Sequence, residues 1–129
     1  MGINFDRALK LHAQALHLRS RRTEIVAANL ANADTPGYMA RDFNFKTAMA
    51  EALGAEQPLK VTHAHHLQAP GHNPGELLYR MPSQKSLDGN TVETEQEKSV
   101  FADNALRYQV SLQFLSGRVK GLMSAIKGE

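Results

Sequence analysis

Apolar side chains recur at alternating spacings of four and three residues through the last third of the chain. On a helix, this heptad pattern forms one apolar stripe that another helix has to cover. The stripe consists of Phe101, Ala105, Tyr108, Leu112, Leu115, Val119, Leu122 and Ile126. Acidic residues at 93, 95 and 97 and basic residues at 118, 120 and 127 suit the helix dipole. We therefore expect one long helix over residues 91–127.

A weaker version of the same pattern stands at the other end of the chain. Residues 5–32 contain neither Pro nor Gly, and good helix formers dominate them. Three polar side chains interrupt its heptad line, which consists of Phe5, Leu9, His12, Leu16, Arg19, Thr23, Val26 and Leu30. A second apolar line, at Leu11, Leu18 and Ile25, lies on another side. A helix of this kind has neighbours on more than one side, and we expect some of them to belong to other chains.

The middle of the chain, residues 33–90, contains all five prolines and reads as irregular. We expect a turn with Pro36 and Gly37 at its centre, since these residues suit the two central positions of a type II turn. Further expected elements are a helix over residues 43–53 with Asp42 as its N-cap and Gly54 at its end, strands at 59–62 and 77–81, and a turn at 88–90.

Together these segments predict a mainly α single domain over residues 1–129. The two long terminal helices, residues 5–32 and 91–127, are expected to pair as an antiparallel coiled coil. Residues 33–90 would then form an irregular, partly β excursion between them.

Composition excludes several classes of function. The chain has 129 residues, no cysteine and a formal net charge of +2, which excludes disulfide and thiolate sites and disfavours a nucleic-acid binder. No nucleophile elbow, P-loop or dinucleotide-binding motif occurs, so we expect no enzyme, no cofactor and no metal. A histidine group, His63, His65, His66 and His72, could bind zinc, but we interpret it as a set of solvated loop side chains. The basic run at residues 19–22 could bind phosphate, but we interpret it as a solvated or subunit-pairing helix face.

The densest motif lies where the first helix is expected to end. Its residues are Asn29, Leu30, Ala31, Asn32, Thr35, Pro36, Gly37 and Tyr38. Asn29 and Asn32 can bond backbone groups that an ending helix leaves free, Pro36 stops the helix, and Gly37 permits a positive φ.

This string closely resembles the N-terminal signature of bacterial flagellar axial proteins. Segments 38–43, 89–92, 104–109 and 115–122 narrow the resemblance to the basal body rod proteins, and among these to the rod protein nearest the membrane ring. The resemblance implies a structural subunit of the proximal rod. Such subunits assemble helically with other rod proteins, link the membrane ring to the distal rod and transmit torque for motility.

The resemblance also implies partners and a location. The partners would be copies of the chain itself, other proximal rod proteins, the adaptor protein FliE, the membrane-ring protein at the rod base and the flagellar export gate. The rod lies within the periplasmic space, and its subunits leave the cytoplasm through the flagellar type III apparatus without a cleaved signal. Phe5 and Leu9 resemble the element that early substrates present to the export gate, although both also fit plain packing on the heptad line.

One alternative stays open at this point. A monomeric helical binding or adaptor module is an alternative explanation of the two long helices. Such a module should melt cooperatively alone, whereas a rod subunit should order its termini only in an assembly.

Overall fold

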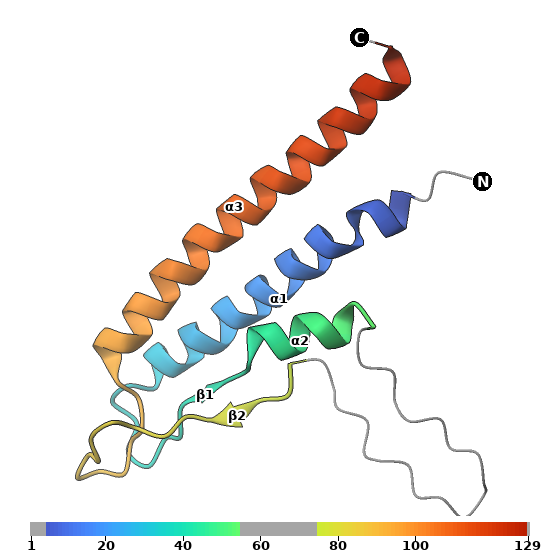
Figure 1. Ribbon diagram of the computed structural model, residues 1–129. Helices are drawn as coiled ribbons and strands as arrows, with labels where there is room; N and C mark the ends of the chain where they lie inside the picture. The colour runs from blue at the N-terminus through green and yellow to red at the C-terminus, as the bar shows by residue number, and fades with distance from the viewer. Residues whose placement is uncertain (1–4, 55–74, 129) are drawn as a thin grey trace, which may run out of the picture.

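The computed structural model describes residues 5–54 and 75–128, without the side chains of residues 6–8. The elements are α1 (Phe5–Ala31), β1 (Arg41–Asp42), α2 (Phe45–Ala52), β2 (Leu78–Tyr79) and α3 (Thr94–Lys127). Helices α1 and α3 lie side by side in opposite directions, and α2 lies on another side of α1 (Figure 1). The start of α1 and the end of α3 form one end of the molecule, the open end. The end of α1, the start of α3 and residues 81–93 form the opposite, closed end.

The predicted mainly α class is confirmed, and both long helices lie close to their expected bounds. Helix α3 ends at Gly128, which has a φ of 76° and whose N–H donates to the Ser124 carbonyl over 2.9 Å. Glycine adopts this left-handed conformation without the Cβ strain that other residues suffer, which makes it a common helix terminator. In the described part of the chain, no helix is both long and apolar enough to cross a membrane.

The short helix α2 begins later than the sequence predicted. Its N-cap is Asn44, whose Oδ1 accepts from the N–H groups of Lys46 at 3.0 Å and Thr47 at 3.2 Å. The prediction of Asp42 as N-cap was wrong, because the Asp42 carboxylate is taken by two arginines and by the N–H of Phe43. Gly54 follows the helix with a φ of 77°, as expected for a helix end.

A two-stranded antiparallel sheet joins the two ends of the central excursion. Arg41 lies opposite Tyr79, and Asp42 opposite Leu78. The strand predicted at 77–81 is therefore confirmed in its central residues, whereas β1 was not foreseen. The strand predicted at 59–62 lies outside the described residues.

The hydrophobic core is small and lies between α1 and α2. Leu18, Phe43 and Ala48 are buried there, with Ile25 and Phe45 partly buried against them. Leu18 and Ile25 of the second apolar line of α1 therefore pack against a neighbour from the same chain, whereas Leu11 of that line is 47% exposed. That some neighbours of α1 belong to other chains stays a prediction.

The contact between α1 and α3 is more polar than the heptad pattern predicted. The residues of α3 that reach α1 include Glu97, Asn104 and Ser111, which are seven residues apart. Asn104 is buried and donates to the Arg19 carbonyl and to the Thr23 hydroxyl, both at 2.9 Å. This polar line points at α1, so the apolar stripe of α3 is turned partly away from it.

Candidate functional site

The exit of α1 forms the turn that the motif predicted. The Tyr38 N–H donates to the Thr35 carbonyl at 3.2 Å, which closes a turn with Pro36 and Gly37 at its centre. Gly37 has a φ of 71°, so the predicted positive φ is confirmed. Its N–H donates to the Asp88 carbonyl at 2.9 Å and so joins the turn to the loop that leads into α3.

Asn90 caps the end of α1 from that loop. Its Nδ2 lies 3.0 Å from the Asn32 carbonyl oxygen, 2.7 Å from that of Ala33 and 3.0 Å from that of Thr35. Its Oδ1 accepts from the Val92 N–H at 2.8 Å. These three carbonyls belong to the turn that follows the last residue of α1, so this one buried amide connects the exit of the helix to the loop before α3.

Asn29 connects α1 to β1 and to α3 and does not cap the helix. Its side chain is 0% exposed. Its Nδ2 donates to the Arg41 carbonyl at 2.8 Å and to Glu97 Oε2 at 3.3 Å, and its Oδ1 accepts from the Arg41 N–H at 3.0 Å. The expectation that Asn29 bonds the ending helix was therefore wrong, whereas Asn32 does so through its 2.8 Å bond to the Ala28 carbonyl.

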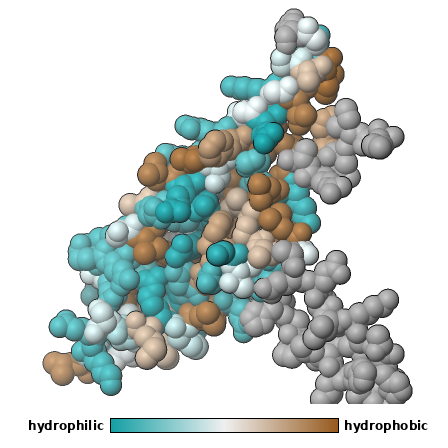
Figure 2. Space-filling model, in the orientation of Figure 1, coloured by the Kyte–Doolittle hydropathy of each residue, from teal (hydrophilic) through white to brown (hydrophobic). Residues whose placement is uncertain are grey.

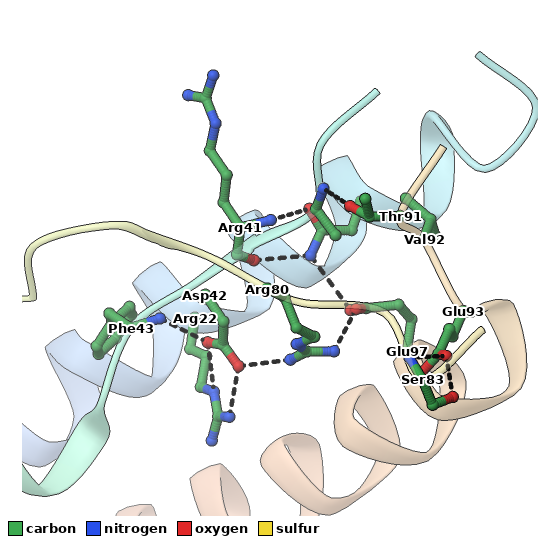
Figure 3. Close-up of polar contacts among 12 residues, drawn as sticks. Arg22, Arg41, Asp42, Phe43, Arg80, Ser83, Thr91, Val92, Glu93 and Glu97 are labelled. Atoms are coloured by element: carbon green, nitrogen blue, oxygen red, sulfur yellow. Dashed lines mark hydrogen bonds and ion pairs between the residues drawn. The ribbon is translucent and has the colours of Figure 1, made fainter. Parts of the chain in front are cut away.

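Four charged side chains continue this network (Figure 3). Arg80 pairs with Glu97 of α3 and donates to Asp42 Oδ2 at 2.6 Å. Arg22 of α1 binds the two oxygens of Asp42 at 3.1 and 2.8 Å. Glu97 is itself 0% exposed, so its charge depends on these partners. Arg80, which follows β2, therefore connects this strand to α3 through Glu97 and to α1 through Asp42 and Arg22.

The network shifts the pKa of Asp42. Burial alone would raise it, but hydrogen bonds from Arg22, the Phe43 N–H and Arg80 outweigh burial and hold the pKa below its ordinary value. The same contact with Asp42 raises the pKa of Arg22. Folding therefore favours the ionised form of Asp42.

The basic run at residues 19–22 also serves the fold. The Arg19 guanidinium lies 4.3 Å from the centre of the Phe45 ring, and that of Arg21 lies 5.9 Å from the centre of the Phe43 ring. With Arg22 on Asp42, these side chains hold α1 against α2 and β1. The interpretation of a solvated face was therefore wrong for these three arginines, whereas subunit pairing stays a prediction.

The apolar stripe of α3 lies partly open on the single chain. Leu112 is 49% exposed and Ile126 is 70% exposed. Phe101, Tyr108 and Val119 are each exposed by more than a third. Ala105, Leu115 and Leu122 are half-buried. The stripe is therefore available for contacts that α1 does not provide.

The candidates for export lie at the open end. Phe5 is 43% exposed, and Leu9 lines a groove of about 300 Å³ with Gly117, Arg118, Gly121 and Leu122. The histidine group at 63–72 lies outside the described residues. Within the described ranges, no group of three or more His, Cys, Asp or Glu residues is placed to hold a metal ion.

Sequence reasoning missed three residues of the network. Arg80 carried no signal, because its partners lie 38 and 17 positions away. Glu97 was interpreted only as a dipole charge, although its spacing of seven from Asn104 was visible. Asn90 stood in a predicted turn, where an asparagine oxygen commonly accepts from the N–H two residues on, as it does here from Val92. Its donor bonds to the exit of α1 span 55–58 positions and carried no local signal.

These features define a class of protein: a helical hairpin with a fastened closed end and an uncovered apolar stripe, as in a subunit that assembles with others. Residues 9–38, from α1 to the exit turn, match the family described as flagella basal body rod protein.

Relatives narrow the class further. The flagellar basal body rod protein FlgB of Salmonella typhimurium is 46% identical to this chain. The alignment is 131 positions long and covers 95% of this chain and 95% of that protein. FlgB of Aeromonas hydrophila is 45% identical over an alignment that covers 100% of this chain and 99% of that protein. FlgB of Cereibacter sphaeroides is 51% identical over an alignment that covers 97% of this chain and 98% of that protein. The chain belongs to the FlgB family of flagellar basal body rod proteins.

Proposed function

We propose that this chain is a structural subunit of the proximal rod of the bacterial flagellar basal body, where it assembles helically with other rod proteins. The observation that carries the proposal is family membership along nearly the whole chain, since the FlgB relatives match both long helices and the exit turn. In this role the subunit links the membrane ring to the distal rod and transmits torque for motility.

The uncovered stripe of α3 supports assembly. Leu112, Val119 and Ile126 lie on it at spacings of seven and are exposed on the single chain. A row of large apolar side chains that the chain itself covers only in part marks an interaction surface. In the rod we expect α1 and α3 to complete an antiparallel coiled coil while neighbouring subunits cover this stripe. A binding or adaptor module would also need such a surface, so family membership, not the stripe, decides between the two functions.

The partners and route follow from the family. We propose contacts with copies of the chain itself, with other proximal rod proteins, with the adaptor FliE and with the membrane-ring protein at the rod base. The subunit would reach the periplasmic space through the flagellar export gate, with Phe5 and Leu9 as the export candidates. The role is that of a structural protein, not an enzyme, and needs no cofactor.

A deletion strain tests the proposal. Loss of the chain should abolish swimming and leave basal bodies without a rod in electron micrographs, and the wild-type chain should restore both. Complete rods and normal swimming in the deletion strain would contradict the proposal. The purified chain should also show loosely ordered helix ends, whereas an adaptor module would melt in one sharp transition.

A further inference from the structure

Three polar side chains of α3 bond directly to α1. They are Glu97, Asn104 and Ser111, which lie seven residues apart on one line of the helix, and we call them the polar ladder. Glu97 accepts from the Asn29 side chain at 3.3 Å, and the Ser111 hydroxyl accepts from Arg19 Nε at 3.2 Å. A spacing of seven keeps the ladder on one side of α3. These contacts therefore hold α1 on the polar face of α3.

Asn104, the middle member of the ladder, destabilises the contact in which it lies. It is 1% exposed, and its Oδ1 is buried without a hydrogen-bond partner among the described residues. A buried polar atom without a partner lowers stability. Its Nδ2 donates to the Arg19 carbonyl, but that carbonyl also accepts from the Thr23 hydroxyl at 3.0 Å. A leucine at position 104 would leave no group of α1 unpaired, so the stability of the single chain does not account for the asparagine.

The apolar stripe of α3 runs beside the polar ladder and is partly open. Figure 2 shows hydrophobic atoms on the surface toward the end of α3, at the top of the view. Leu112 of the stripe directly follows Ser111 of the ladder, so a rotation of α3 by less than about 100° would turn the stripe toward α1. Covering these exposed side chains with α1 would be favourable. A second packing of the two helices therefore competes with the observed one.

The competing packing concerns the part of α3 beyond Asn104. Glu97 is paired with Arg80 and bonded to Asn29, and these contacts fasten the closed end in either packing. Toward the open end, α1 carries Leu9 and Leu16 on its heptad line, and both are half-buried. They are apolar side chains that the stripe can meet after a rotation. Asn104 lies between the fastened end and this apolar part, so its bonds to α1 oppose the rotation.

We propose that the polar ladder, through Asn104, keeps α1 off the apolar stripe of α3 and so reserves the stripe for a neighbouring subunit. The inference rests on the proposed function and names the residue that decides whether the stripe is covered from inside or outside the chain. Asn104 lowers the stability of the single chain and keeps the assembly surface available. A single buried asparagine in a coiled coil likewise selects one pairing of helices at a cost in stability.

Thiol labelling tests the packing of the purified full-length chain, which contains no natural cysteine. Leu112→Cys places a thiol on the stripe, at a position that is 49% exposed. Adding Asn104→Leu should slow its reaction with a maleimide by about fivefold or more and raise the midpoint of thermal unfolding by several degrees. The matched control, Leu106→Cys, lies outside the stripe at a position of α3 that is 62% exposed and should keep its rate.

A second variant guards against a steric clash at position 104. Asn104→Ala is smaller than the natural residue and should also slow labelling at position 112, because it removes the same bonds to α1. If Asn104 only stabilises the fold, Asn104→Leu lowers the unfolding midpoint and both variants leave labelling at position 112 as fast or faster. That labelling result overturns the proposal and leaves the rod role standing.

Swimming of the deletion strain measures the consequence for assembly. The wild-type chain should restore swimming, whereas Asn104→Leu should be secreted normally and fail to restore it. Normal swimming with Asn104→Leu, although the thiol at position 112 is protected, overturns the proposal, because a stripe covered from inside would then permit assembly. Loss of secretion places the defect in export and overturns it as well. Failure of the wild-type chain to restore swimming refutes the rod role itself, which the labelling rates do not depend on.

Discussion

At the scale of single residues, two asparagines connect segments that lie far apart in the sequence. Asn29 joins α1 to β1 and to Glu97, and Asn90 joins the start of α3 to the end of α1. Both amides are buried, and each uses its donor and its acceptor together. Because a buried polar group without partners is costly, these contacts select one arrangement of the closed end.

The turn glycine allows a test in which folding and assembly can be separated. Gly37 and Gly54 both have positive φ angles, and a Cβ at either would meet no atom within 4 Å. Valine at either position should therefore lower the free energy of unfolding by a similar amount, about 1–3 kcal/mol. We expect Gly37→Val to abolish rod assembly and Gly54→Val to leave cells swimming, since only Gly37 is bonded to the loop that leads into α3. Chemical denaturation and motility assays measure the two effects, and equal motility of the two variants would contradict a special role of the exit turn in assembly.

Asp42 makes stability depend on pH in a definite direction. Its folded pKa lies below the ordinary value of 3.8, so its ionised form stabilises the fold above that pH and the stabilisation is lost as pH falls toward the folded pKa. Asp42→Asn should therefore be less stable than the wild type at pH 7, and the difference should shrink below about pH 4. Asp103→Asn, which removes a solvent-exposed pair with Arg107, is the control and should change little at any pH. Denaturation curves from pH 3 to 7 measure both differences, and a constant difference for Asp42→Asn would refute the argument.

At the scale of elements, α3 carries two faces that the heptad pattern did not separate. The pattern placed one stripe against α1, but the side chains that bond α1 are the polar ones at positions 97, 104 and 111. An apolar pattern reports which side chains need cover but not which chain covers them. A polar position inside such a contact fixes the register of two helices at some cost in stability, as Asn104 would do here.

The same reasoning explains how far the sequence could predict this structure. Helix bounds followed from local signals: apolar periodicity, the Pro36 stop, and the acidic and basic side chains at the two ends of the second long helix. The network of Arg22, Asp42, Arg80 and Glu97 joins four segments, and no local signal encodes it. Asp42 shows the limit clearly, because it and Asn44 are equally good N-caps in sequence, and two arginines distant in the chain decide between them.

Helix α3 provides a prediction about the uncovered stripe. Leu112 is 49% exposed, so an aspartate there stays solvated in the isolated chain and should change its thermal unfolding little. In the rod the same carboxylate would be buried against a neighbour, so we expect Leu112→Asp to abolish assembly and motility. Leu18→Asp is the contrast, since Leu18 is buried against Phe43 and its replacement should unfold the chain. A Leu112→Asp strain that swims normally would remove the stripe from the assembly.

At the scale of the whole molecule, Phe5 and Leu9 have to serve two states of the chain. In the folded state they lie at the open end, where Phe5 is 43% exposed and Leu9 lines the groove. A fully buried phenylalanine would cost about 3–5 kcal/mol on truncation to alanine, and partial exposure reduces that loss. Packing in the single chain therefore gives Phe5 only a modest role, whereas recognition by an export gate acts on the unfolded chain before any packing exists.

Secretion measurements can separate these two roles. In a strain that exports early substrates but cannot build the rod, packing predicts no change in secretion for Phe5→Ala, because unfolded chains have no contacts to lose. A gate element predicts the opposite, with the variant accumulating in the cytoplasm. We expect reduced secretion for Phe5→Ala and near-normal secretion for Leu16→Ala, which is half-buried on the same heptad line but lies outside the proposed element. If both variants are secreted alike, Phe5 is a packing residue whose ring becomes fully covered only when a neighbouring subunit docks at the open end.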